Sequence, residues 1–216
     1  MRWQLFSDLP PEEIRRVLTT ARRRTFSRGE VVFHEGDPAD SLHLVEKGRF
    51  AVRVTTALAD TATLAIRGPG EAFGELALVS DAPRSATVAA LEPAETHSLY
   101  RREFDQLRRD HPHVDRMLVA VLAAEVRRMD ELIVEAFYLS AEKRVRRRLR
   151  DLAAVYGGGS GPITVPLTQE DLAGLAGTSR ATVNRVLREE ELRGAVSLGR
   201  GKTTVLDLEM LTRRAQ

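Results

Sequence analysis

The first half of the chain changes from a helical pattern to a strand pattern near residue 25. Prolines and glutamates in residues 7–13 suit the first turn of a helix. From about residue 25 to residue 99, short β-rich runs are separated by Gly, Pro and Asp, which is typical of an all-β roll or barrel. The runs lie at residues 31–33, 42–45, 50–54, 63–66 and 87–89.

Residues 112–138 contain no glycine and no proline after Pro112, which predicts one long helix. Apolar positions recur in it at alternating steps of four and three residues, and a seam of that length favours a two-helix coiled coil and therefore a dimer. A long helix packed on its own domain is the alternative, and the charged Glu125 keeps it open. The expected dimer-interface residues are Leu118, Leu122, Glu125, Met129, Leu132 and Ala136.

Two further helices joined by a tight turn are predicted in the last third of the chain. Residues 143–156 form a helix of their own, followed by a flexible glycine-rich connector at 157–161. Thr168-Gln169-Glu170-Asp171 is a capping box that opens the first helix of the pair. Gly177 permits a sharp turn, and Thr178-Ser179 caps the second helix.

The second helix of this pair has two chemically different faces. At about 100° per residue, its polar face spans roughly 140° of arc and its aliphatic face lies opposite. The polar face holds Arg180, Ala181, Asn184, Arg185 and Arg188, and the aliphatic face Val183, Val186 and Leu187. Arginine reads guanine O6 and N7 in the major groove, and asparagine reads adenine N6 and N7. A solvated amphipathic hairpin is the alternative.

A wing completes the predicted DNA-binding motif. Residues 194–208 alternate between apolar and polar positions around Gly199-Arg200-Gly201, which predicts a β-hairpin. In helix-turn-helix proteins the start of the second helix faces base edges. The expected DNA-binding residues are Thr168, Ser179, Arg180, Ala181, Thr182, Asn184, Arg185, Arg188 and Lys202.

Residues 73–88 carry the chemistry of a site for a phosphate and a ribose. Gly74 lets the backbone approach a ligand closely, and Glu75 supplies a carboxylate acceptor for ribose hydroxyls. Arg84, followed by the hydroxyl of Ser85, supplies the forked donor that a phosphate needs. A buried Glu75–Arg84 ion pair that braces a loop is the structural alternative.

Charge and composition narrow the function classes. The formal net charge is +2, but the part from residue 140 onward holds 14 Lys and Arg against 9 Asp and Glu, which favours contact with a polyanion. Absence of cysteine excludes disulfides, thiolate nucleophiles and cysteine-bound iron–sulfur clusters. The five histidines show no paired metal spacing and no nucleophile–base pair stands out, so neither a metal site nor an enzyme is expected. No signal-peptide pattern and no apolar run of ~20 residues occur, so we expect a cytoplasmic protein with no membrane partner.

Three stretches of the sequence resemble one known family. Residues 33–48 resemble the opening strands of the cyclic-nucleotide-binding domain, and residues 73–88 resemble its phosphate-binding cassette. Residues 168–187 are similar to the DNA-binding signature of the cyclic-AMP receptor protein/fumarate–nitrate regulator (CRP/FNR) family of bacterial transcription factors, and the chain is identified as a member. The resemblance implies an α+β fold with an amino-terminal cyclic-nucleotide-binding-like β-roll (1–110), a long dimerisation helix (111–138) and a carboxy-terminal winged helix-turn-helix (139–216).

The resemblance also implies how the cassette would bind its ligand. Gly74 and Glu75 would hold the ribose hydroxyl, and Arg84 with Ser85 the cyclic phosphate, while the dimerisation helix lies over the base. RNA polymerase would be the downstream partner. The expected ligand-binding residues are Gly74, Glu75, Leu76, Arg84, Ser85, Ala86, Arg128 and Met129.

Two departures from the family pattern concern specificity. Arg128 and Met129 stand where cyclic-AMP sensors of the family carry a Thr-Ser pair that meets the adenine. Arg128 is therefore expected to favour a guanine edge, to stack over a purine, or to belong to a vestigial pocket. Arg180 and Arg185 would contact bases, but Ala181 replaces the usual glutamate of the recognition helix. Alanine accepts no hydrogen bond from cytosine and contacts a thymine methyl, so a different operator base pair is expected.

Three functions compete on this basis. The first is a homodimeric DNA-binding transcription regulator gated allosterically by a cyclic nucleotide, cAMP first and cGMP second, with no covalent or metal cofactor. The second is the same regulator acting without a ligand, its vestigial pocket filled by an Arg84–Glu75 pair or by other side chains. The third is a nucleotide-sensing scaffold protein, which the polar face of the second helix disfavours. The operator, the target genes and the choice between activation and repression are not specified by the sequence.

Overall fold

The computed structural model describes residues 3–57, 61–80, 82–157 and 161–215. The chain divides into two compact units, Met1–Arg128 and Met129–Gln216. The division falls inside one continuous helix, α4, which spans His113–Tyr138 as predicted for residues 112–138. Most of the predicted glycine-rich connector (158–160) and Asp81 of the cassette lie outside the described residues.

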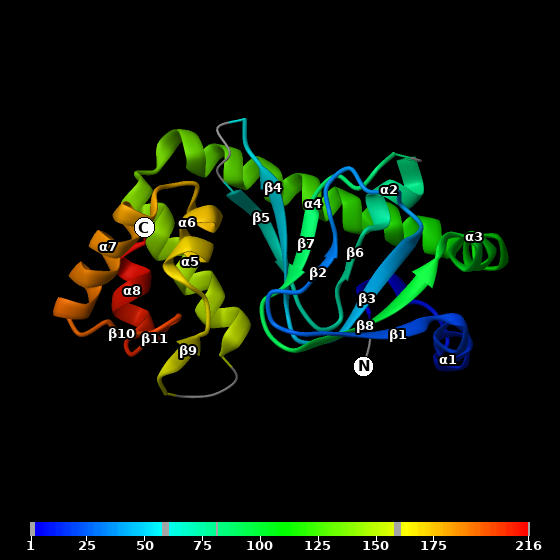
Figure 1. The fold of residues 1–216 in the computed structure, drawn as a ribbon, viewed down its shortest axis with the longest axis horizontal. Coiled ribbons are helices and arrows are strands. Elements are labelled where there is room, and N and C mark those ends of the chain that lie inside the picture. Colours follow the sequence, from blue (N-terminus) through cyan, green and yellow to red (C-terminus); the bar gives the residue numbers. More distant parts are fainter. Residues whose placement is uncertain (1–2, 58–60, 81, 158–160, 216) are drawn as a thin grey trace. The chain divides into compact units, whose positions relative to one another are not determined.

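The first unit is built on two antiparallel sheets, which confirms the predicted roll (Figure 1). Within the described residues each sheet has four strands, in the orders β1-β8-β3-β6 and β2-β7-β4-β5. Strands β2, β3, β4, β5 and β7 match the predicted runs, whereas β1, β6 and β8 were not predicted. The strands are β1 (Arg22–Phe26), β2 (Val31–Phe33), β3 (Ser41–Lys47), β4 (Phe50–Thr55), β5 (Thr61–Arg67), β6 (Ala72–Phe73), β7 (Thr87–Ala90) and β8 (Ala94–Tyr100).

Two buried clusters hold the first unit together. One draws aromatic side chains from both sheets, with the ring of Phe50 centred 5.5 Å from that of Phe26 and 5.0 Å from that of Phe73. The other packs the start of α4 against the roll through Val114 and Leu118. Leu118 was predicted to lie at the dimer interface and is a core residue instead, because this face of α4 is covered by its own unit.

The helices of the first unit follow local sequence signals. Helix α1 begins at Pro11 with Glu12 and Glu13 in its first turn, as predicted from the proline and the favourable position of acids near a helix amino terminus. Helices α2 and α3 were not predicted. The bounds are η1 (Gln4–Phe6), α1 (Pro11–Thr20), α2 (Glu75–Ser80) and α3 (Arg101–Asp110).

The second unit contains the predicted helix pair and wing. Strands β10 and β11 form the hairpin, Gly199 pairs with Lys202, and β9 adds a third strand within the described residues. Strand β9 and helix α8 were not predicted. The elements are α5 (Ala141–Tyr156), β9 (Ile163–Val165), α6 (Gln169–Ala176), α7 (Arg180–Leu192), β10 (Val196–Gly199), β11 (Lys202–Val205) and α8 (Leu208–Arg214).

Side-chain caps begin both helices of the pair where the sequence predicts them. Thr168 Oγ1 accepts from the backbone N–H of Asp171 at 3.1 Å, and Asp171 Oδ2 accepts from the N–H of Thr168 at 2.9 Å, which confirms the capping box. Gly177 has φ 58°, a left-handed conformation that favours glycine. Ser179 caps α7 by accepting from the N–H of Thr182 at 3.2 Å.

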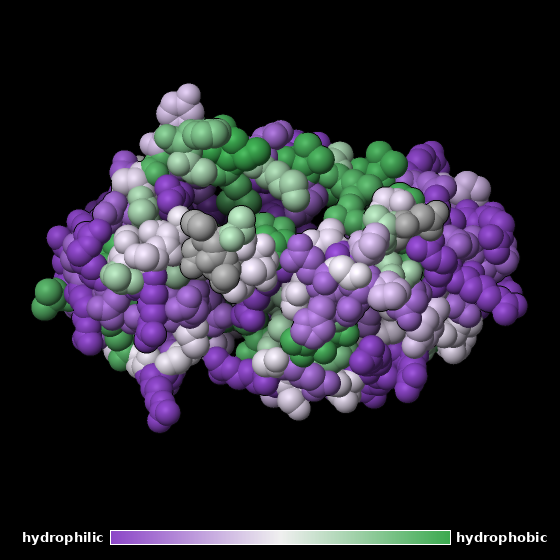
Figure 2. Space-filling model, turned by 45° about the horizontal axis from the view of Figure 1, so that its top comes forward, coloured by the Kyte–Doolittle hydropathy of each residue, from purple (hydrophilic) through white to green (hydrophobic). Residues whose placement is uncertain are grey.

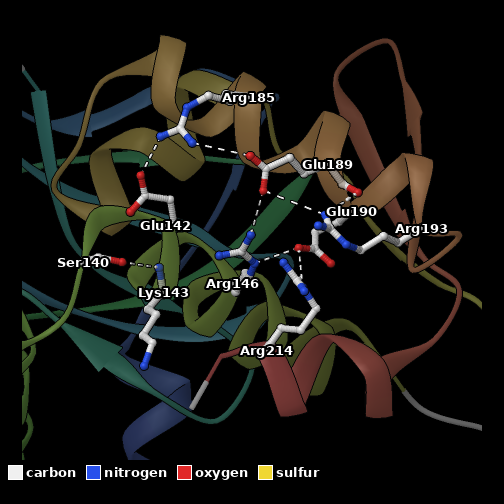
Figure 3. Close-up of polar contacts among 9 residues, drawn as sticks. All are labelled: Ser140, Glu142, Lys143, Arg146, Arg185, Glu189, Glu190, Arg193 and Arg214. Atoms are coloured by element: carbon white, nitrogen blue, oxygen red, sulfur yellow. Dashed lines mark hydrogen bonds and ion pairs between the residues drawn. The ribbon is translucent and has the colours of Figure 1, made fainter.

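Helix α7 is held in place by aliphatic and ionic contacts together. Its predicted aliphatic residues, Val183, Val186 and Leu187, are all buried. Glu190, one turn further, is 0% exposed and accepts from Arg146 Nε at 2.7 Å and from Arg214 Nε at 2.9 Å (Figure 3). Helices α5 and α8, which supply the two arginines, therefore fix one side of α7.

Candidate nucleotide and DNA sites

The arginine of the cassette is fixed by three acceptors from two segments of the chain. Its side chain is only 2% exposed. Arg84 Nη1 donates to the carbonyl oxygen of Gly74 at 3.1 Å, and Nη2 donates to Ser41 Oγ at 3.2 Å and Asp40 Oδ1 at 3.4 Å. Gly74 has φ 87°, and a Cβ there would lie 2.6 Å from Arg84 Nη1. Glycine at position 74 is therefore what allows this arginine to approach the backbone.

Arg84 keeps the capacity to bind an anion. Its guanidinium carbon lies 4.1 Å from the centre of the Phe33 ring, and its buried Nε has no hydrogen-bond partner in the described part of the chain. Burial lowers the pKa of Arg84, and the carboxylates of Asp40 and Asp37 oppose that effect. An arginine remains charged in proteins, so this site holds a desolvated cation of the kind that binds a phosphate.

A cavity of about 350 Å³ lies beside Arg84. Its walls include Ser41 and His43, but neither Glu75 nor Ser85. Burial, helped by the charges of Arg84 and Arg24, lowers the pKa of His43 to about 3, so the imidazole is neutral at pH 7. Of the predicted ligand-binding residues of the cassette, Arg84 therefore lines this cavity, whereas Glu75 and Ser85 do not.

Glu75 is half-buried at the first position of α2. Burial raises the pKa of its carboxyl, while its own backbone N–H and Arg67 act in the opposite direction. The alternative of a Glu75–Arg84 ion pair is not realised, because within the described residues Arg84 pairs with the carboxylate of Asp40. Glu75 therefore remains available as an acceptor for a hydroxyl group.

Two arginines and one glutamate join α4 to strand β5 at the other end of the cassette. Glu125 accepts from Arg67 Nη2 at 2.9 Å and from Arg128 Nη2 at 2.5 Å. Arg128 Nη2 also donates to the carbonyl oxygen of Leu64 at 3.0 Å. Burial alone would raise the pKa of Glu125, but the hydrogen bonds from Arg128 and Arg67 lower it to about 2. Glu125, predicted on the dimer seam, is thus engaged within its own unit.

The other predicted ligand residues lie in different environments. Leu76, Ser85 and Met129 are exposed, whereas Ala86 is buried. Sequence reasoning missed Asp40, Ser41 and Arg67, whose roles depend on contacts between segments far apart in the chain. No short-range motif marks them.

The predicted polar face of α7 is exposed as expected. Exposed positions along this helix include Arg180, Ala181, Asn184, Arg185 and Arg188. Ser179 at the cap and Lys202 in the wing are exposed as well, whereas Thr168 and Thr182 are half-buried. Because the opposite aliphatic side is buried, the two faces of the helix have the division that the sequence predicts.

Two of these cations, Arg185 and Arg188, have carboxylate partners within the unit. Arg185 donates to Glu142 Oε1 at 2.5 Å and to Glu189 Oε1 at 3.4 Å (Figure 3). The hydrogen bond from Arg185 is the main reason why the pKa of Glu142 falls to about 2. Arg188 pairs with Glu191 at 2.9 Å. Among the described residues Arg180 forms no ion pair. Exposed pairs of this kind are worth little, so they compete only weakly with a DNA contact.

A continuous apolar stripe lies on the exposed side of α4, and apolar atoms gather along this helix in Figure 2. Val126 is 57% exposed and Ile133 52% exposed. The stripe shares three positions with the predicted seam and lies one residue further along the chain at the other three. Leu118 and Glu125 are replaced in it because the first unit buries the one and pairs the other. Its residues are Val119, Leu122, Val126, Met129, Ile133 and Ala136, to which Phe137 adds a 79% exposed ring. Leu122 is half-buried, because it also packs against the core of the first unit.

Two other kinds of site are not found in the described part of the chain. No group of three or more His, Asp or Glu side chains is placed to hold a metal ion. Nor does any described helix combine the length and apolar character that crossing a bilayer requires.

Known protein families match both units. Residues 23–111 match the cyclic nucleotide-binding domain, and residues 143–214 match the Crp-like helix-turn-helix domain. The cyclic AMP receptor protein of Thermus thermophilus is 37% identical over 207 residues, covering 96% of this chain and 94% of the relative. The CRP-like cAMP-activated global transcriptional regulator of Mycobacterium tuberculosis is 30% identical over 215 residues, covering 98% and 96%.

Solved structures repeat the fold over the length of the chain. The crystal structure of the Thermus thermophilus catabolite activator protein is 35% identical, covers 98% of both chains and has a TM-score of 0.58. The c-di-GMP responsive regulator CLP of Xanthomonas campestris, at 23% identity, covers 91% of this chain and 99% of its own with a TM-score of 0.79. The second likeness concerns the fold alone.

The pairing of Glu125 generates a prediction about acid stability. Its pKa in the folded state, about 2, lies below the ordinary value of 4.5, so the pairing stabilises the fold above about pH 4.5. That contribution is lost progressively as the pH falls toward 2. We expect Glu125→Gln to lower the thermal unfolding midpoint at pH 7, and the difference from the parent to shrink between pH 4.5 and pH 3.

Glu131→Gln is the matched control, because Glu131 is an exposed glutamate on the same helix. Thermal melts followed by circular dichroism are expected to show little effect of this control at any pH. A Glu125→Gln deficit that stays constant from pH 7 to pH 3 would contradict the assignment.

Proposed function

Since the chain belongs to the CRP/FNR family of transcription factors, we propose that it is a homodimeric regulator whose DNA affinity is gated by a cyclic nucleotide. Residues 1–110 would sense the ligand, 111–138 dimerise and 139–216 read DNA. The observation that carries the proposal is the exposed polar face of α7, which lies opposite the buried aliphatic face of the same helix. The cytoplasm is its expected location, and RNA polymerase its expected downstream partner.

The DNA interface is proposed from the side chains that this polar face exposes. Arg180 has no ion-pair partner among the described residues, and the capped start of α7 is the part that faces base edges in this class of motif. Lys202 in the wing supplies a cation for a phosphate. Arg180, Ala181, Asn184 and Arg185 are the proposed base-facing residues.

The ligand site is proposed from the environment of Arg84. A cyclic phosphate would meet a buried, charged guanidinium with an unpartnered Nε, and the ribose hydroxyl would meet the carboxylate of Glu75. Ser85 and the backbone at Gly74 would complete the contacts. cAMP is the first candidate, because two relatives carry it in their names, and cGMP is the second.

The base would lie beyond Glu75, toward the Arg67–Glu125–Arg128 cluster. This cluster lies between α4 and β5, so a base bound there would touch the helix that carries the dimer stripe. Binding would change DNA affinity only as far as the two arrangements of the dimer differ in their affinity for the nucleotide.

The dimer is proposed to form through the exposed stripe of α4. Its residues recur with a heptad spacing, Val119, Val126 and Ile133 at one position and Leu122 and Met129 at the other. β-branched residues at the first position and leucine at the second favour two-stranded coiled coils. This seam contains no charged residue, whereas the seam first predicted contained Glu125.

A regulator that acts without a ligand is the second candidate. It is favoured by Arg128, which reaches from α4 to the carbonyl of Leu64 and so occupies the expected base position with a protein side chain. The gated form is favoured because Arg84 Nε lacks a hydrogen-bond partner among the described residues and because Arg84 pairs with Asp40 and not with Glu75. The third candidate, a nucleotide-sensing scaffold that does not bind DNA, would not need the exposed arginines of α7.

We expect Arg180→Ala to weaken operator binding by ~1–3 kcal/mol and to relax preference at one base pair, because it removes a bidentate guanine contact. Fluorescence anisotropy with the operator and with single-base variants measures both effects. Arg213→Ala, on the exposed side of α8, is the control and should leave affinity nearly unchanged. If Arg180→Ala weakened binding to every duplex equally, Arg180 would contact a phosphate and not a base.

Titration calorimetry with cAMP and cGMP tests the proposed gate. The parent should bind one of them and gain operator affinity, whereas Arg84→Lys should lose most nucleotide affinity and keep basal DNA binding, because lysine lacks the forked donor. Arg102→Lys changes an exposed arginine and serves as the control. No heat with either nucleotide and no gain in DNA affinity would eliminate the gated form and leave the ligand-free regulator.

Sedimentation equilibrium tests the dimer stripe. Val126→Glu places a charge in the middle of the apolar seam and is expected to yield a monomer, because burying it would leave an unpaired charge. Arg127→Glu alters the neighbouring exposed residue, off the seam, and should remain dimeric. A dimeric Val126→Glu protein would show that the chains associate through another surface.

A further inference from the structure

Two amide side chains meet where α6 and α7 approach each other. Asn184 Nδ2 donates to Gln169 Oε1 at 3.1 Å. Gln169 is the first residue of α6, directly after the capping residue Thr168, and is half-buried. Asn184 is exposed on α7. The contact therefore ties a residue of the proposed base-reading face to the amino terminus of the preceding helix.

This hydrogen bond decides which groups of Asn184 remain free. An asparagine amide has two N–H donors and one carbonyl acceptor. One N–H is directed at Gln169, so the second N–H and the whole of Oδ1 are left for another partner. One donor beside one acceptor is the complement of adenine in the major groove, which presents N7 as acceptor and the N6 amino group as donor.

The position of Asn184 on the helix suits a base contact. At about 100° per residue it lies ~40° around the helix from Arg180 and ~100° from Arg185, so it is central in the polar arc. Ala181, one turn earlier on the same side, carries only a methyl group. A short asparagine side chain is thus not screened from the groove by that neighbour.

We infer that Asn184 reads an adenine in each half-site and that Gln169 is the positioning residue that sets the orientation of its amide. The inference rests on the proposed DNA-binding function and deepens it by naming one base of the operator. Gln169 would accept the N–H of Asn184 that points away from Oδ1, which leaves the other N–H and Oδ1 side by side toward the groove. Without that acceptor the amide is free to rotate, and the preference for adenine weakens.

The test is selection of binding sites from a random duplex library by the full-length parent and by three variants. Asn184→Ala should lose the preference for adenine at one position of each half-site, about 5- to 150-fold, and keep the preferences at the other positions. Gln169→Leu removes the acceptor and should weaken the same preference. Gln169→Glu retains an acceptor oxygen and should preserve it, even if its added charge lowers affinity for every sequence alike.

Each outcome separates the inference from the function on which it rests. If the parent enriches no sequence, the proposed DNA function fails. If the parent enriches a motif that Asn184→Ala reproduces unchanged, the function stands and the adenine contact is wrong. If Asn184→Ala alters one position but Gln169→Leu and Gln169→Glu both match the parent, the positioning role of Gln169 is wrong.

Discussion

The orientation of α7 depends on a carboxylate that is fully removed from water. Glu190 is tolerated in the core because Arg146 and Arg214 donate to it from two other helices. Removing one partner of such a buried pair typically costs ~3–5 kcal/mol, so the three helices are held in one arrangement. Together with the aliphatic residues around it, this pairing determines which side of α7 is left to face DNA.

The first unit uses buried charge in a different way. Arg84 is as deeply buried as an ordinary core residue, and its acceptors are a backbone carbonyl, a hydroxyl and a carboxylate at 3.4 Å. None of these contacts uses Nε, which has no hydrogen-bond partner among the residues that the structure describes. A buried donor without a partner is costly, so a phosphate that supplies the missing acceptor gains affinity from the same residue that the fold already holds in place.

Local signals in the sequence were sufficient for the helix pair of the DNA-binding unit, although they did not reveal β9 or α8. The capping box at Thr168, the left-handed turn at Gly177 and the two faces of α7 each depend on residues within one or two helical turns, and all are present. The roll was predicted as a class, but β1 and β8 were not, because their pairing joins Arg22 to Ser98 across most of the unit. A charged run such as that of β1 gives no alternation from which a strand could be recognised.

Contacts between distant segments account for the remaining differences. The spacing of apolar residues in α4 suits two seams that share every second position, and only the packing of Leu118 into the first unit shows which seam is left exposed. Asp40 and Ser41 meet Arg84 from more than forty positions away in the chain, which no motif reports. Gln169 belongs to the capping box, yet its contact with Asn184 follows from how two helices meet.

Methylation interference on an isolated operator tests most directly whether α7 enters the major groove. Dimethyl sulfate modifies guanine N7 in the major groove and adenine N3 in the minor groove, so the two modifications report on different grooves. Loss of binding on guanine N7 methylation, in two clusters one helical turn or about 34 Å apart, is the expected result. Interference confined to adenine N3, or none at either position, would contradict a dimer that reads base edges with the exposed face of α7.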